Sequence, residues 1–184
     1  MPRSDRIPGI RPRPSLGRRL DIAARASFPA VSTAGLMMLT AAPFGFAGQA
    51  ALLPATALAA VYFWSLFRPA AMAPVVVVVI GILLDLLGYL PLGVGVLTLL
   101  VVHGFAARWQ RVLARQSFLV VWVAFLGFAA GAAALGWALT SLLQFRLLPV
   151  SAALFQFVVS AAIYPALAIL FVRAQRSVAA PERA

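Results

Sequence analysis

Long apolar segments with very few charges run from Phe28 to Val172, and they limit the fold more than any other feature of the sequence. Hydrophobic residues make up 64% of the 184 residues, and charged residues only 10%. A soluble domain of this length could not cover its surface with so few polar groups, so the segments predict transmembrane helices. The strands of a membrane barrel would alternate polar and apolar residues, which these segments do not.

Turn residues and arginines divide the apolar sequence into six predicted spans, an all-α integral membrane fold. The spans cover about 28–47, 50–67, 70–87, the stretch from the turn at 88–95 to about 107, part of 117–143, and 150–172. Each is close to the roughly 20 residues that cross a bilayer as a helix. The predicted domains are an Arg/Pro-rich arm (1–27), a six-helix membrane domain (28–175) and a tail (176–184).

The N-terminal arm is basic and rich in proline. Its seven arginines face only two acidic residues, and four prolines in its first half oppose a regular helix. The composition favours a disordered, positively charged tail that guides membrane insertion. A short basic interfacial helix within 15–27 is the alternative.

The arginines also predict the orientation in the membrane. With six spans, both termini and the loops near Arg68 and 108–115 fall on one side, which then carries every arginine except Arg146. Because positive loops stay in the cytoplasm during insertion, both termini are predicted to be cytoplasmic. These arginines would also attract anionic lipids, by about 1 kcal/mol per residue near the surface.

Several function classes lack their usual residues. The chain has no cysteine, which removes disulfides and thiolate chemistry, and its net charge of +11 sits at the ends of apolar segments. That distribution fits membrane topology better than nucleic-acid binding. Serine-hydrolase, zinc-protease and phosphate-loop motifs are missing, as is a cluster of acidic residues for magnesium. We therefore expect no enzymatic activity, metal or cofactor.

Asp85 is the only acidic residue between positions 22 and 181. It follows Arg68 by 17 residues, or about 25 Å of helix, and so lies near the outer edge of the roughly 30 Å hydrocarbon core. A carboxylate there needs a partner or water. Arg146 is the one basic residue predicted on that side, so we expect an ion pair between them. A proton-binding or substrate-binding carboxylate is the functional alternative.

His103 is predicted in the fourth span, near the face opposite to that of Asp85. A metal site needs several ligands, and the membrane segments supply one histidine and one carboxylate. This favours a hydrogen-bonded histidine between two helices over a ligand or a catalytic base.

Small residues recur on one face of the fifth span. They lie at spacings of four, three and four, which would let a second helix approach closely. That helix could belong to this chain or to another protein. The residues of this small-residue seam are Gly127, Gly131, Ala134 and Ala138.

The stretch from about 52 to 100 contains short motifs in a fixed order: an early proline in the second span, an aromatic stretch with Tyr62 and Trp64 that ends in Arg-Pro, a glycine four residues before Asp85, a short turn and Leu-Gly. The residues of these motifs are Pro54, Arg68, Pro69, Gly81, Asp85, Leu92 and Gly93. In this order the stretch resembles the MreD family, the rod shape-determining membrane proteins of bacteria, in which the glycine and aspartate form the motif Gly-Leu-x-x-Asp.

The resemblance implies a non-enzymatic scaffold in the bacterial inner membrane. MreD-like proteins work beside MreC, a single-pass membrane protein, within the elongation complex that contains MreB filaments and the peptidoglycan synthases. Their fold is similar to the substrate-binding subunits of vitamin transporters, so a small-molecule binding or uptake subunit is the alternative. A fold shared with transporters does not by itself imply transport.

Overall fold

The computed structural model describes residues 16–43, 45 and 48–179, and within them the chain is all helical, as the sequence predicts. Six α-helices are joined by short connections, two of which include 3-10 turns, η1 (Gln49–Ala51) and η2 (Pro69–Ala71). The helices are α1 (Leu16–Ala41), α2 (Leu52–Phe67), α3 (Pro74–Leu87), α4 (Val94–Leu113), α5 (Phe118–Leu143) and α6 (Val150–Ala179).

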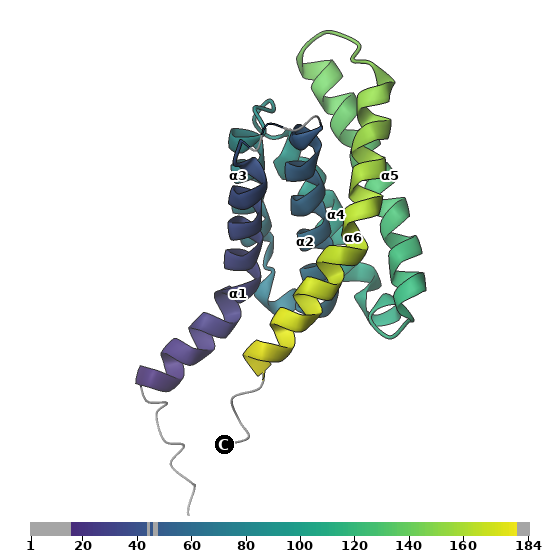
Figure 1. Ribbon diagram of the computed structural model, residues 1–184. Coiled ribbons are helices and arrows are strands. Elements are labelled where there is room, and N and C mark those ends of the chain that lie inside the picture. The colour runs from purple at the N-terminus through teal and green to yellow at the C-terminus, as the bar shows by residue number, and fades with distance from the viewer. Residues whose placement is uncertain (1–15, 44, 46–47, 180–184) are drawn as a thin grey trace, which may run out of the picture.

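Helix α2 occupies the centre of the bundle. It packs against α1, α4 and α6, and every residue from Ala55 to Leu66 is buried. Helices α3 and α4 form a closely packed antiparallel pair, and α5 packs against both α4 and α6. The start of α1 and the end of α6 lie at the same end of the bundle, while α5 and α6 extend beyond the other helices at the opposite end (Figure 1).

Three helices are longer than the sequence predicted. Helix α1 begins at Leu16, so the second half of the arm 1–27 is helical and continues into the first predicted span, while residues 1–15 lie outside the described residues. The helix also passes through Pro29, whose carbonyl accepts a hydrogen bond from the Thr33 hydroxyl at 2.7 Å.

Helix α4 likewise continues to Leu113, although the basic segment 107–116 was expected to be a loop. The reason is tertiary, because Leu113 is buried and extends the apolar face of the helix by one more turn. Helix α6 includes the first residues of the predicted tail, up to Ala179, and residues 180–184 lie outside the described part of the chain.

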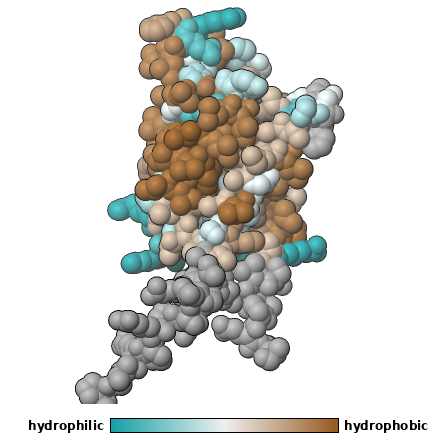
Figure 2. Space-filling model, turned by 90° about the vertical axis from the view of Figure 1, so that its left-hand side faces the viewer, coloured by the Kyte–Doolittle hydropathy of each residue, from teal (hydrophilic) through white to brown (hydrophobic). Residues whose placement is uncertain are grey.

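Three segments are long and apolar enough to cross a membrane. They are Gln49–Phe67, Phe118–Leu143 and Val150–Gln175. The apolar helices Ala26–Ala41 and Pro74–Leu87 are shorter. Figure 2 shows a broad apolar surface on one side of the bundle, with polar residues gathered toward its two ends.

Aromatic side chains join α2 to α5 and α6 in one half of the bundle. Phe125 of α5 stacks on Tyr164 of α6 at a ring distance of 4.1 Å, and Tyr62 of α2 packs against both rings. The Tyr62 hydroxyl donates a hydrogen bond to the Val121 carbonyl at 3.1 Å. This cluster holds the three helices together at the end where α5 begins.

Candidate functional site

The Asp85 carboxylate fastens the end of α3 to the start of α4. Its Oδ2 accepts a hydrogen bond from the Gly93 amide at 2.7 Å, and its Oδ1 accepts one from the Gly95 amide at 2.6 Å. The first amides of a helix have no partner within the helix and attract negative charge. Asp85 thus caps α4 from a neighbouring helix, and its side chain is 1% exposed.

Glycines make this contact possible. Gly93 precedes α4 with a φ of 100°, a left-handed conformation that side-chain-bearing residues rarely adopt. A Cβ on Gly95 would lie 2.5 Å from Asp85 Oδ1, and one on Gly81 would lie 2.5 Å from the Val96 Cα. We call the contact of Asp85, Gly81, Gly93 and Gly95 the α3–α4 clasp.

The predicted ion pair between Asp85 and Arg146 is wrong. Both residues are described, and no ion pair joins them. The carboxylate oxygens instead accept hydrogen bonds from two backbone amides. Arg146 is exposed in the loop between α5 and α6. The partner of the carboxylate is the backbone of α4, which no pattern of charged side chains could have revealed.

The remaining residues of the resemblance lie at helix ends. Pro54 is in the first turn of α2, where a missing backbone N–H costs nothing. Arg68 and Pro69 form the junction between α2 and η2, and the Arg68 amide donates to the Trp64 carbonyl at 2.8 Å. Leu92 is exposed in the turn before α4.

His103 bonds to a neighbouring helix. Its Nδ1 lies 2.8 Å from the hydroxyl oxygen of Ser65 on α2, and both residues are buried. This confirms the interhelical hydrogen bond predicted for His103, and Ser65 is the partner that sequence reasoning missed. In the described part of the chain, no group of three His, Cys, Asp or Glu side chains could hold a metal ion.

The small-residue seam of α5 is exposed. Gly127, Gly131, Ala134 and Ala138 all face away from the packed interior, and a Cβ on either glycine would meet no atom within 4 Å. Among the described helices, none packs closely against this seam. The close internal helix contact that its spacing allowed is therefore not made there.

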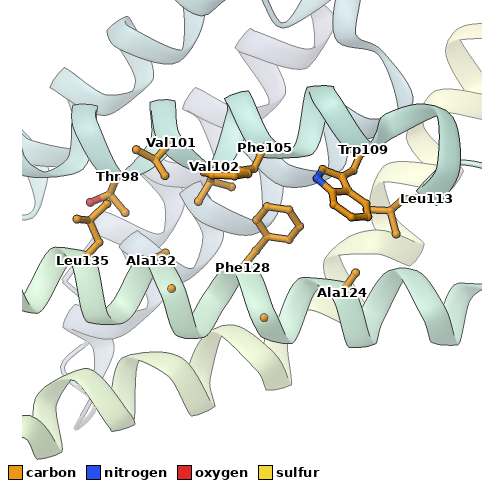
Figure 3. Close-up of a pocket in the computed structure, with 12 residues that line it drawn as sticks. Thr98, Val101, Val102, Phe105, Trp109, Leu113, Ala124, Phe128, Ala132 and Leu135 are labelled. Atoms are coloured by element: carbon orange, nitrogen blue, oxygen red, sulfur yellow. The ribbon is translucent and has the colours of Figure 1, made fainter.

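The two glycines instead help to line a groove between α4 and α5, which we call the α4–α5 groove. Its volume is about 440 Å³. Figure 3 shows apolar side chains of α4 facing α5 across it, with Trp109 and Phe128 on opposite walls. The lining is apolar except for Thr98 and the indole nitrogen of Trp109. The α4 residues are Thr98, Val101, Val102, Phe105, Trp109 and Leu113, and the α5 residues are Ala124, Gly127, Phe128, Gly131, Ala132 and Leu135.

No known family model, curated protein or solved structure matches this chain. The local geometry of the molecule offers a closed polar contact at the α3–α4 clasp and an open apolar surface at the α4–α5 groove.

Proposed function

We propose that the chain is a non-enzymatic scaffold of the bacterial inner membrane that acts in the cell-wall elongation complex. In this proposal all six helices span the membrane and both termini are cytoplasmic. The order of Pro54, Arg68, Pro69, Gly81, Asp85 and Gly93 supports the resemblance to MreD. The arginine distribution supports the orientation. The loop between α5 and α6, which contains Arg146, lies at the end of the bundle opposite to the loop between α4 and α5 with Arg115 and to the end of α6 with Arg173 (Figure 1).

The α4–α5 groove is the observation that carries the proposal. A transmembrane helix binds another by close packing, and small residues on one helix let the second approach. Gly127 and Gly131 provide such a floor, while Phe105 and Trp109 provide a wall. The partner we assign to this groove is the membrane helix of an MreC-like single-pass protein, through which MreB-like filaments and peptidoglycan synthases would be joined.

The α3–α4 clasp supports the same role. Helix α4 forms one wall of the groove, and the clasp fixes the position of its first turn against α3. A wall whose position is set before binding reduces the conformational entropy lost on association. The clasp has no access to solvent at Asp85, which fits a structural anchor better than an exchanging proton site.

Co-purification tests the proposal. The chain is expressed with the MreC-like single-pass protein of the same organism, solubilised in a mild detergent and captured by an affinity tag. We expect the partner to be retained by the wild type. Gly131→Leu should add volume in the groove and lose the partner, and a Cβ at this position meets no atom of this chain within 4 Å.

The matched control is Ala130→Leu, which adds a leucine at the adjacent exposed position that does not line the groove. This variant should retain the partner at the wild-type level. Retention of the partner by Gly131→Leu would contradict the assigned binding surface, and failure of the wild type to retain it would contradict the scaffold itself.

A further inference from the structure

A second hollow lies between the helices, on the other side of the contact between α4 and α5, and it is partly open, since Pro149 and Ala152 in its wall are exposed. Its volume is about 330 Å³, and α2, α4, α5 and α6 all contribute to its wall. Only Thr98 and Ala132 line both this cavity and the α4–α5 groove. The size lies at the lower end of the range of small-molecule sites, which is about 300–1,000 Å³.

The wall of the cavity is apolar and carries no charged side chain. Leu58 of α2, Leu99 of α4 and Ala133 of α5 are typical members. An ion in such an environment would lose its hydration without a compensating partner, at a high free-energy cost. Any occupant must therefore be neutral and mostly apolar.

Gln156 of α6 supplies the polar group. Its Nε2 donates one hydrogen bond to the Ser160 hydroxyl at 3.2 Å, and that hydroxyl donates to the Gln156 backbone carbonyl at 2.8 Å. A carboxamide has a second N–H and an acceptor oxygen. Neither has a partner among the described residues, so the side chain retains one donor and one acceptor at the cavity wall.

Two other polar groups in the wall are already engaged. The Thr140 hydroxyl donates to the Gly136 carbonyl at 2.7 Å, and the Trp137 indole donates to the Leu148 carbonyl at 3.0 Å. Two groups in the wall keep unused hydrogen-bonding capacity, the Thr98 hydroxyl and the Gln156 carboxamide. Gln156 offers both a second N–H and an acceptor oxygen, so we take it as the group that orients a ligand. Trp137 is useful for a different reason, since its fluorescence reports on what lies in the cavity.

We infer that this cavity is a binding site for a small neutral amphipath, a molecule with an apolar body and one hydroxyl or amide group that hydrogen-bonds to Gln156. The apolar body would bury its surface against the leucine and alanine side chains, which drives binding. The inference does not rest on the scaffold function. Such a ligand is compatible with both functions, because a scaffold could carry it as a structural component and an uptake subunit could carry it as a substrate.

The experiment measures quenching of Trp137 by brominated probes in phosphatidylcholine nanodiscs. The probes are bromo-octanol, which has the polar group, and bromo-octane, which lacks it. We expect bromo-octanol to quench the wild type with a saturable component that Trp137→Phe removes. Gln156→Leu should weaken bromo-octanol binding by up to about tenfold, the equivalent of one net hydrogen bond, and leave bromo-octane binding unchanged.

Two variants that fill the cavity test its location. Gly136→Leu and Ala133→Leu should each remove the saturable component for both probes, and a Cβ at Gly136 meets no atom within 4 Å. Ala130→Leu is the control, since Ala130 does not line the cavity, and the probes should quench this variant as they quench the wild type. Size-exclusion profiles and melting temperatures confirm that each variant is folded, and having two filling variants means that the result does not depend on either one alone.

Three results would overturn the inference. Quenching that rises linearly with probe concentration and is equal in all folded variants would mean that the probes only partition into the bilayer. If Gln156→Leu weakened the binding of both probes equally, the result would contradict a hydrogen bond between Gln156 and the ligand. The third result uses host lipids with brominated acyl chains. If these lipids quench Trp137, Gly136→Leu abolishes that quenching, and bromo-octanol gives no saturable quenching, then the cavity holds a lipid tail instead.

Discussion

Helix α2 and the contact between α3 and α4 are packed more closely than the outer faces of α5 and α6. In an 18-residue apolar window of the segment that ends with α2, 78% of the residues are buried, compared with 22% in such a window of α5 and 28% in one of α6. Small residues occur in both regions but have opposite effects. Gly81 and Gly95 bring α3 and α4 into direct backbone contact, whereas Gly127 and Gly131 leave open space.

This difference shows that a glycine in an apolar helix does not by itself indicate a tight contact. Close approach in the α3–α4 pair depends on Asp85, which supplies two hydrogen bonds across the interface. Helix α5 has no such group at Gly127 or Gly131, and its aromatic contacts with α2 and α6 lie around Phe125. The closed region is suited to stability, and the open region is suited to binding.

Among these variants, removal of the Asp85 carboxylate should cause the largest loss of stability, because it breaks the contact that closes the α3–α4 pair. Asp85→Ala leaves two backbone donors without a partner, and each unpaired buried donor costs about 1–3 kcal/mol, so several kcal/mol of stability should be lost. Asp85→Asn should lose less, because one acceptor oxygen remains. The free energy of unfolding in detergent micelles measures both.

Leu86→Ala is the control for Asp85→Ala, since its side chain is adjacent but exposed, and it should be close to neutral. The charge-swapped pair Asp85→Arg with Arg146→Asp should not recover stability, because Arg146 is not the partner. Recovery by the swap would refute the clasp.

A methyl group at Gly81 should have the next largest effect. Gly81→Ala places a Cβ 2.5 Å from the Val96 Cα, so α3 and α4 must move apart, and overpacking of this kind costs about 1–3 kcal/mol. Gly104→Ala on α4 is the matched control, because its Cβ meets no atom within 4 Å. The control should be neutral or gain up to about 1 kcal/mol from helix propensity. Equal melting temperatures for the two variants would contradict the close approach.

A smaller effect, of opposite sign, is expected at Thr98, which lies where the groove and the cavity meet. Its hydroxyl oxygen is buried and has no hydrogen-bond partner within the described residues. Thr98→Val replaces the hydroxyl by a methyl group of similar size, so the melting temperature should stay the same or rise slightly. A clear fall would show that the hydroxyl has a partner, such as a bound water molecule.

The helices and the main turns could be predicted from the sequence. Apolar segment length and turn residues gave six helices, and the turn at 88–95 separates α3 from α4 as expected. The start of α1 and the end of α4 were less predictable. At the end of α4, tertiary burial keeps Leu113 helical.

The hydrogen-bond partners of the polar side chains could not be predicted from the sequence. Every residue except proline has a backbone N–H, so nothing in the sequence marks Gly93 and Gly95 as the donors to Asp85. The pairing of His103 with Ser65 joins residues far apart in the chain. The spacing of Gly127 and Gly131 likewise indicated a surface for helix packing, but not that the surface would be left open.

Cross-linking from the α4–α5 groove tests the central claim most directly. The photoreactive amino acid benzoylphenylalanine replaces Phe105, an exposed aromatic residue of the groove wall, or Val79, an exposed residue of α3 outside the groove. Both variants are produced with the MreC-like protein in living bacteria and irradiated. We predict a cross-link to that protein from position 105 and none from position 79. A cross-link from position 79 alone, or none from position 105 although the proteins co-purify, would contradict the claim that the open side of α4 and α5 binds the partner.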